Sequence, residues 1–175
     1  RPADLCGAEA GGSGKTLRSP VTCSVLFVCL GNICRSPLAE GALRAEARRL
    51  NLDLHVDSAG TGNWHAGEPP DRRAQATALK HGVDISGLRA RQVRTEDFRR
   101  FDHIIALDHD NLSNLRRLAP PDASAELSQL LDHVPGPAGQ GVPVPWFGDA
   151  AGFETTWADV SAGARALAAR FTPAR

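Results

Sequence analysis

Residues 25–37 have the sequence VLFVCLGNICRSP, an apolar run followed by a turn and then by a proline. An apolar run bounded by turn signals is typical of a strand that is buried on both faces of a parallel sheet. Pro37 suits the first turn of a helix, because the N–H group that proline lacks would have no helical partner there. Apolar residues then recur with a helical period as far as Leu50. This stretch therefore predicts a strand, a tight loop and a helix in direct succession.

The rest of the chain alternates between predicted strands and predicted helices. We expect strands at 52–56 and 102–107, helices at 71–81, 111–118 and 153–171, and a loop rich in Pro and Gly at 135–148. Such an alternation favours a parallel sheet with helices on both faces, because crossover connections are right-handed. In these sheets a ligand binds beyond the carboxyl ends of the strands. The loop that follows residue 28 begins at that edge.

The composition predicts one domain. A chain of 175 residues that is 42% hydrophobic can bury one core and is short for two. Residues 1–21 are rich in Gly, Ala, Ser and Pro and predict a disordered tail, which leaves the domain at 22–175. The 20 basic and 20 acidic residues cancel, so neither nucleic acid nor a membrane surface is an expected partner.

The four cysteines lie within the first 34 residues, which is a poor layout for cross-linking a chain of this length. We therefore expect four thiols and a cytoplasmic protein, although the sequence leaves export open. The six histidines show no spacing typical of metal ligands, so we expect no metal and no cofactor.

Cys29 and Arg35 are separated by five residues that join the predicted strand to the predicted helix. A loop of this size can direct successive backbone N–H groups to one point, where the helix N-terminus also attracts an anion. The same field favours the thiolate form of Cys29, and Arg35 can hold two phosphate oxygens with its planar fork. The pattern predicts attack of Cys29 on phosphorus to give a phosphocysteine. The alternative is that Cys29 is an apolar thiol that ends a core strand.

Residues 28–40, VCLGNICRSPLAE, resemble the phosphate-binding signature of the low-molecular-weight protein tyrosine phosphatases. The resemblance continues through residues 57–64, 71–72, 80–82, 89–92, 96–98, 107–108 and 111–112, and it covers about 24–172. It implies a single-domain, doubly wound, flavodoxin-like fold with a four-stranded parallel sheet and helices on both faces. It also implies a hydrolase that acts on tyrosine-phosphorylated proteins as a monomer or weak dimer.

The same resemblance implies a role for each residue of the loop. Cys29 is the expected nucleophile and Arg35 the expected clamp of the transition state. Ser36 is expected to donate a hydrogen bond to the thiolate, and Asn32 to brace the loop near Ser58. The phosphate-binding residues are expected to be Leu30, Gly31, Asn32, Ile33, Cys34, Arg35 and Ser36.

Three aromatic residues, Trp64, Trp146 and Phe147, are expected to line the substrate cleft. Cys34 matches a family cysteine that pairs with the nucleophile on oxidation, so a redox role is expected for it. Alternatively, Cys34 only packs beneath the loop.

One position departs from the family. The general acid of the family is an aspartate followed by proline, two aromatic residues and often glycine, whereas residues 144–148 are VPWFG, with Val144 in place of the acid. Loss of a general acid costs about 10²- to 10⁴-fold in rate. Three explanations are open. Val144 slows turnover while substrate binding stays intact, or Asp149 replaces the missing acid. Alternatively, the loop is shifted and another acid such as Asp132 acts as the general acid.

Other functions compete with hydrolysis of phosphotyrosine. A module that binds phosphotyrosine with little turnover is consistent with Val144. Arsenate reductases of this fold use further cysteines downstream, and this chain has none after Cys34. Protein arginine phosphatases of the family carry a small polar residue at the position of Ile33, whose bulk favours an aryl phosphate.

Overall fold

The computed structural model describes residues 23–145 and 149–173. The predicted tail at 1–21 lies outside the described residues, as do Trp146 and Phe147. The elements are, in chain order, β1 (Cys23–Cys29), α1 (Arg35–Leu50), β2 (Leu54–Gly60), α2 (Arg72–Lys80), α3 (Asp97–Arg100), β3 (His103–Ala106), α4 (His109–Leu118), β4 (Glu126–Gln129), the 3₁₀-helix η1 (Leu130–His133) and α5 (Ala150–Phe171).

The four strands form one sheet in the order β2-β1-β3-β4, and every neighbouring pair is parallel. This is the doubly wound, flavodoxin-like arrangement, so the predicted fold class is confirmed. The central strand β1 pairs on both sides: Val28 lies opposite Ala59 of β2 and Ala106 of β3. The chain order reverses around β1, and such a reversal opens a crevice at the carboxyl ends of the strands.

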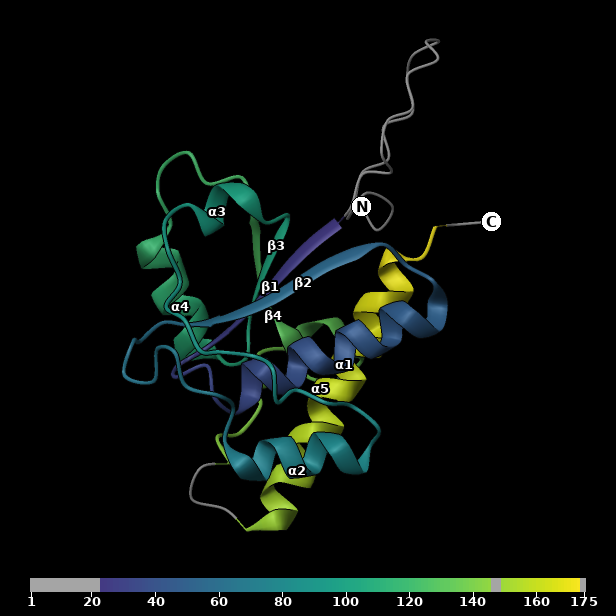
Figure 1. The fold of residues 1–175 in the computed structure, drawn as a ribbon. Helices are drawn as coiled ribbons and strands as arrows, with labels where there is room; N and C mark the ends of the chain where they lie inside the picture. Colours follow the sequence, from purple (N-terminus) through teal and green to yellow (C-terminus); the bar gives the residue numbers. More distant parts are fainter. Residues whose placement is uncertain (1–22, 146–148, 174–175) are drawn as a thin grey trace.

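Side chains of β1 alternate between the two faces of the sheet. Val25 and Phe27 belong to the core that α1, α2 and α5 cover, whereas Leu26 and Val28 belong to the core under α3 and α4. Figure 1 shows α1, α2 and α5 on one side of the strands and α3 and α4 on the opposite side. All four side chains are fully buried. The unbroken apolar run is therefore required by burial on both faces.

The helix ends follow local chemistry. The Asp71 carboxylate accepts a hydrogen bond of 2.8 Å from the Arg73 N–H and so caps the start of α2. Gly82, with φ of 80°, follows the end of α2 in the left-handed region that glycine adopts readily. The helix predicted at 71–81 therefore agrees with α2 to within one residue at each end.

Several elements differ from the prediction. β2 extends four residues beyond its predicted end, because the polar segment at 57–60 continues to pair with β1. β4 was not predicted from periodicity, since this four-residue strand is largely half-buried or exposed and carries no apolar run. The short helices α3 and η1 also lack a periodic signal long enough to detect.

The expectation of four thiols is wrong for Cys23, which is disulfide-bonded. Cys29 and Cys34 are both free and buried. Cysteines that are poorly placed to cross-link a whole fold can still form a disulfide.

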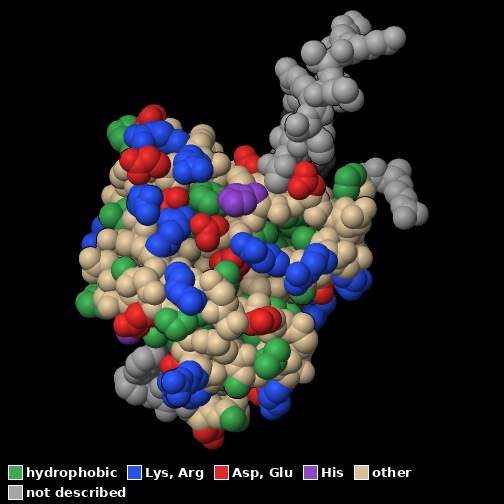
Figure 2. Space-filling view, in the orientation of Figure 1, with side chains coloured by type: hydrophobic (Ala, Val, Ile, Leu, Met, Phe, Trp, Pro, Cys, Tyr) green, Lys and Arg blue, Asp and Glu red, His purple; other side chains and the backbone are tan. Residues whose placement is uncertain are grey.

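Charged side chains of both signs are interspersed over the face seen in Figure 2. None of the helices in the described part of the chain is long and apolar enough to cross a membrane.

Candidate active site

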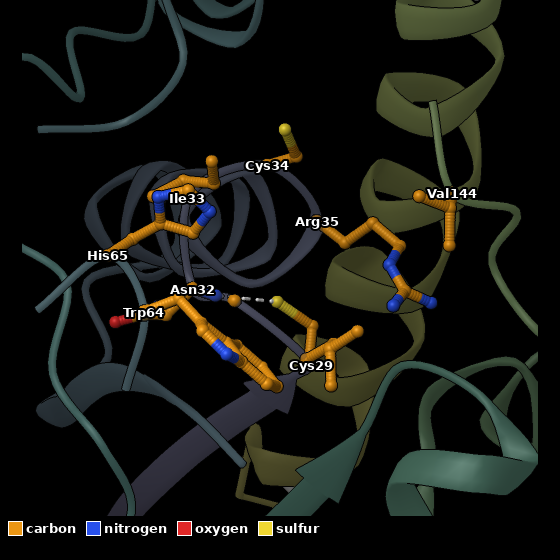
Figure 3. A pocket seen from close by; sticks show the side chains of 10 residues that line it. Cys29, Asn32, Ile33, Cys34, Arg35, Trp64, His65 and Val144 are labelled. Carbon is orange, nitrogen blue, oxygen red and sulfur yellow. Dashed lines mark hydrogen bonds between the residues drawn. The ribbon is translucent and has the colours of Figure 1, made fainter. Parts of the chain in front are cut away.

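The loop at 30–34 joins the carboxyl end of β1 to the first turn of α1. A cavity of about 290 Å³ opens over this loop, and Figure 3 shows side chains of its lining. The lining residues are Cys29, Leu30, Gly31, Asn32, Ile33, Cys34, Arg35, Trp64, His65 and Val144. The structure therefore brings the predicted loop residues together with Trp64 and Val144, which are distant in sequence. Ser36 lies just behind them at the start of α1.

The Cys29 sulfur is buried and receives two polar contacts. The Asn32 N–H donates to Sγ at 3.3 Å, and Ser36 Oγ lies 3.0 Å from Sγ. Ser36 Oγ accepts a hydrogen bond of 2.8 Å from Asn32 Nδ2, so the hydroxyl hydrogen can point toward the sulfur. Two polar groups and the N-terminus of α1 thus lie next to the sulfur.

Asn32 is held in a left-handed backbone conformation with φ of 59°. Asparagine tolerates this conformation better than most residues. Both ends of its amide are bound: Nδ2 also donates to Ser58 Oγ at 3.0 Å, and Oδ1 accepts from the Arg91 N–H at 3.0 Å. These contacts fix the sharp turn that directs the Asn32 N–H toward Cys29.

A buried carboxyl group lies behind this turn. Ser58 Oγ donates to Glu40 Oε1 at 2.7 Å, and Arg44 Nη2 lies 2.8 Å from Glu40 Oε2. Burial raises the pKa of Glu40, while the hydrogen bond from Ser58 and the charge of Arg44 act in the opposite direction. A continuous series of hydrogen bonds thus runs from Glu40 through Ser58, Asn32 and Ser36 to the Cys29 sulfur. Sequence reasoning assigned no role to Glu40.

The guanidinium of Arg35 lies across the cavity from Trp64 and His65 (Figure 3). Its Nη1 donates to Asp108 Oδ2 at 2.5 Å and to the Val142 carbonyl at 3.1 Å. Within the described residues, Nε and Nη2 donate to no protein group, so both remain available to a ligand. A fork with two such donors matches two oxygens of a phosphate.

Asp108 follows the carboxyl end of β3 and caps α4, since its Oδ1 accepts from the Asn111 N–H at 2.8 Å. Sequence reasoning did not assign Asp108 to the site. Asp108 directly follows a predicted strand, at the edge of the sheet where ligands bind, and this position could have identified it as a site residue.

The position of the expected general acid holds no carboxyl group. Val144 lines the cavity with a side chain that is 56% exposed. Asp149 accepts hydrogen bonds from the N–H groups of Ala151 and Gly152 and caps α5. Asp132 accepts from the Gly139 N–H at 2.7 Å. Neither aspartate lines the cavity, and no described residue of its lining carries a carboxylate.

Cys34 has a different environment from Cys29. Burial, followed by the charge of Asp71, raises the pKa of the Cys34 thiol to about 12. In Figure 3 the Cys34 side chain points away from the Cys29 sulfur. A disulfide between the two would therefore require the loop to rearrange.

Trp64 and His65 form the wall opposite Arg35 (Figure 3). The indole of Trp64 lies against Gly62, where a Cβ atom would come within 1.8 Å of Cζ3. Glycine at position 62 therefore permits the position of the indole. The His65 Nδ1 lies 2.7 Å from Glu68 Oε2. His65 was not predicted as a site residue, and Trp146 and Phe147 lie outside the described residues.

In the part of the chain that the structure describes, no group of three or more His, Cys, Asp or Glu side chains is arranged to hold a metal ion.

Comparisons with known proteins agree with this geometry. A family model for the low molecular weight phosphotyrosine protein phosphatases matches residues 24–174. The chain is 43% identical over 126 residues to the low molecular weight protein-tyrosine-phosphatase YfkJ of Bacillus subtilis, covering 71% of this chain and 81% of that protein.

Two solved structures are also similar. The crystal structure of YfkJ superposes with a TM-score of 0.78 at 38% identity, covering 90% of this chain and 96% of that chain. The crystal structure of the Drosophila arginine phosphatase DARP superposes with a TM-score of 0.81 at 29% identity, covering 86% of this chain and 99% of that chain.

Proposed function

Because the chain belongs to the low molecular weight phosphotyrosine protein phosphatase family, a family of hydrolases, we propose that it hydrolyses phosphotyrosine in proteins through a phosphocysteine on Cys29. The observation that carries the proposal is the environment of the Cys29 sulfur. It lies in the cavity with the Asn32 N–H and the Ser36 hydroxyl within hydrogen-bond distance, next to the two unused donors of Arg35.

In the first step, the Cys29 thiolate attacks phosphorus while the bond from phosphorus to the tyrosine oxygen breaks. Arg35 Nε and Nη2 hold two phosphate oxygens, and the backbone N–H groups of the loop hold the rest. Asp108 fixes the guanidinium through Nη1, so the fork needs little reorganisation when phosphate arrives. The aryl ring occupies the cavity between Trp64 and Val144, where apolar walls suit it.

In the second step, water attacks the phosphocysteine and releases phosphate, which regenerates the Cys29 thiolate. Both steps need a proton transfer that Val144 cannot provide. The departing phenolate takes its proton from water, and the attacking water loses its proton without a positioned base. We therefore propose slow turnover. The absence of a carboxylate at position 144 also removes a negative charge that would face the phosphate dianion, which favours binding of the substrate.

Asp149 and Asp132 are weak substitutes for the missing acid. Each already accepts backbone hydrogen bonds, Asp149 at the start of α5 and Asp132 from Gly139. Either would have to abandon these contacts in order to reach the cavity.

The second candidate function is a module that binds phosphotyrosine and releases almost no product, and Val144 is the observation that favours it. Hydrolysis of phosphoarginine is a third possibility, because DARP has a similar fold. The bulk of Ile33, which lines the cavity, favours an aryl phosphate.

Cys34 is proposed as a redox partner of Cys29, and a reducing compartment such as the cytoplasm would keep Cys29 able to react. The monomeric or weakly dimeric state remains a prediction.

A single-turnover assay with 4-nitrophenyl phosphate tests the chemistry, because 4-nitrophenolate leaves readily without a proton donor. We expect one equivalent of phenol per Cys29 in a rapid burst, a phosphoryl group on Cys29 by mass spectrometry, and slow release of phosphate. Cys29→Ser serves as the control and should give no burst. Tight binding of the aryl phosphate with no phenol released would contradict the proposal and support the binding module. Faster turnover of a phosphoarginine peptide than of the matching phosphotyrosine peptide would contradict the proposed substrate.

A further inference from the structure

A second cavity of about 440 Å³ lies beside the first. Its lining residues are Leu30, Thr61, Gly62, Trp64, Asn114, Arg117 and Leu118. Leu30 and Trp64 line both cavities, so the two cavities adjoin at these side chains. A residue that neighbours phosphotyrosine in a polypeptide can therefore reach the second cavity while the phosphotyrosine occupies the first.

Large apolar side chains are concentrated at these two cavities. Leu30, Trp64 and Leu118 are 48%, 68% and 45% exposed, and all three line the second cavity. Among the described residues, the other exposed large hydrophobic side chains are Val144, which lines the first cavity, and Leu79. Apolar surface that is gathered in this way marks a binding surface rather than a chance distribution.

The second cavity is also positively charged. Arg117 is the charged residue of its lining, and no carboxylate is present among the lining residues. Arg117 Nη2 donates to Asn114 Oδ1, and within residues 23–145 and 149–173 the guanidinium forms no ion pair with a carboxylate. No carboxylate of the described residues therefore compensates its charge. Arg116, its neighbour on α4, is exposed and lies outside the cavity.

A polar atom in the same lining lacks a partner. Thr61 Oγ1 is buried and forms no hydrogen bond with any described residue. A buried hydroxyl without a hydrogen bond is costly.

We propose that the second cavity binds an acidic side chain that neighbours phosphotyrosine in the substrate. The inference rests on the proposed function, because the phosphotyrosine must first occupy the Cys29 cavity. The apolar stem of the acidic residue packs on Leu30, Trp64 and Leu118, and its carboxylate pairs with Arg117. The preferred partner is thus a phosphoprotein whose phosphotyrosine is flanked by Glu or Asp.

Binding of non-hydrolysable peptides tests this specificity without depending on the rate of turnover. Two peptides carry a phosphonate analogue of phosphotyrosine and differ only in Glu or Gln at the flanking positions. By calorimetry, the unsubstituted protein should bind the Glu peptide about threefold more tightly, a ratio typical of a partly exposed ion pair. Arg117→Gln should bring the ratio of the two affinities close to one, and Arg117→Glu should reverse it.

Arg116→Gln is the matched control, because it removes the same charge from the same helix outside the cavity. It should preserve the preference for the Glu peptide. Equal binding of both peptides by the unsubstituted protein, or an equal loss of preference in Arg116→Gln and Arg117→Gln, would overturn the inference while leaving the proposed function intact. If neither phosphonate peptide binds and 4-nitrophenyl phosphate gives no burst, the proposed function itself fails.

Discussion

Asp108 Oδ2 lies 2.5 Å from Nη1 of Arg35, so the residue that caps α4 holds the guanidinium of the residue that begins α1. The contact joins the ends of two adjacent parallel strands, because Asp108 follows β3 and Arg35 follows the loop after β1. It uses one nitrogen of the fork and leaves Nε and Nη2 for a ligand. Asp108 therefore acts as a positioning residue.

Asp108→Asn should lower kcat for an aryl phosphate roughly tenfold, because the guanidinium loses a charge-assisted hydrogen bond that fixes its orientation. The inhibition constant of inorganic phosphate should not rise in parallel, since the substitution also removes a negative charge near the anion. Steady-state kinetics with phosphate as inhibitor separates the two effects. Asp110→Asn, in the first turn of the same helix, is the control and should change neither quantity. A parallel loss of kcat and of phosphate affinity would contradict the positioning role.

Val144→Asp should raise kcat for phosphotyrosine by about 10²- to 10⁴-fold, because it supplies a group that can donate and accept a proton. The gain should be smaller for 4-nitrophenyl phosphate, whose leaving group needs less protonation. Val144→Asn is the control: its side chain has nearly the same shape as that of Asp, but the amide is neither an acid nor a base near neutral pH, so this variant should remain slow. If Val144→Asp leaves kcat unchanged, the acid lies elsewhere in the chain.

Gly62→Ala should weaken binding of aryl phosphates, because the new Cβ would come within 1.8 Å of the Trp64 ring and force the indole to move. Gly87→Ala is the control, since a Cβ at Gly87 meets nothing within 4 Å. Titration with a phenylphosphonate checks affinity, and thermal unfolding checks that both variants fold. Equal affinities in the two variants would show that the position of Trp64 does not matter for the ligand.

Cys34→Ser should reduce the activity that a reductant restores after peroxide treatment, because oxidised Cys29 then has no thiol with which to form a reversible disulfide. In the unsubstituted protein, formation of that disulfide should become faster as pH rises. Burial raises the pKa of Cys34 to about 12, so its thiolate fraction increases throughout the accessible pH range. Recovery that is equal in both proteins would favour the alternative that Cys34 only packs beneath the loop.

His133 should make the protein sensitive to mild acid. Burial, followed by the charge of Arg170 and the proximity of His103, lowers the pKa of His133 from 6.5 to about 4. The unfolded chain binds the proton more readily than the folded chain, so His133 stabilises the fold above pH 6.5 and this stabilisation is lost as pH falls to about 4. Urea unfolding at a series of pH values measures this effect. Between pH 6.5 and about 4, the free energy of unfolding should fall less steeply for His133→Gln than for the unsubstituted protein. His109→Gln, in the exposed first turn of α4, should retain the slope of the unsubstituted protein.

The sequence predicted β1, the loop and α1 well, because burial on both faces of β1 leaves an uninterrupted apolar run. β4 left no such pattern: Glu126 is exposed and the next two residues are half-buried, so pairing with β3 rather than its own sequence orders the strand.

Some residues of the candidate site could be predicted from the sequence and others could not. Cys29 and Arg35 were predicted as site residues because five residues between them form a loop that can curl around an anion. The positions of Asp108 and His65 against that loop depend on how separate strands and connections come together, which the spacing of neighbouring residues does not encode. The disulfide of Cys23 was missed for a related reason, since the number and spacing of cysteines do not reveal which of them meet.

The central place of β1 has a consequence for how the domain opens. Its backbone pairs with β2 on one side and β3 on the other, so β1 cannot separate unless the sheet itself comes apart. The loop at 30–34 is anchored at one end to this strand and at the other to α1. We expect local fluctuations that open edge elements such as β4 to leave this loop intact. The loop should then be lost in the same cooperative event that unfolds the core.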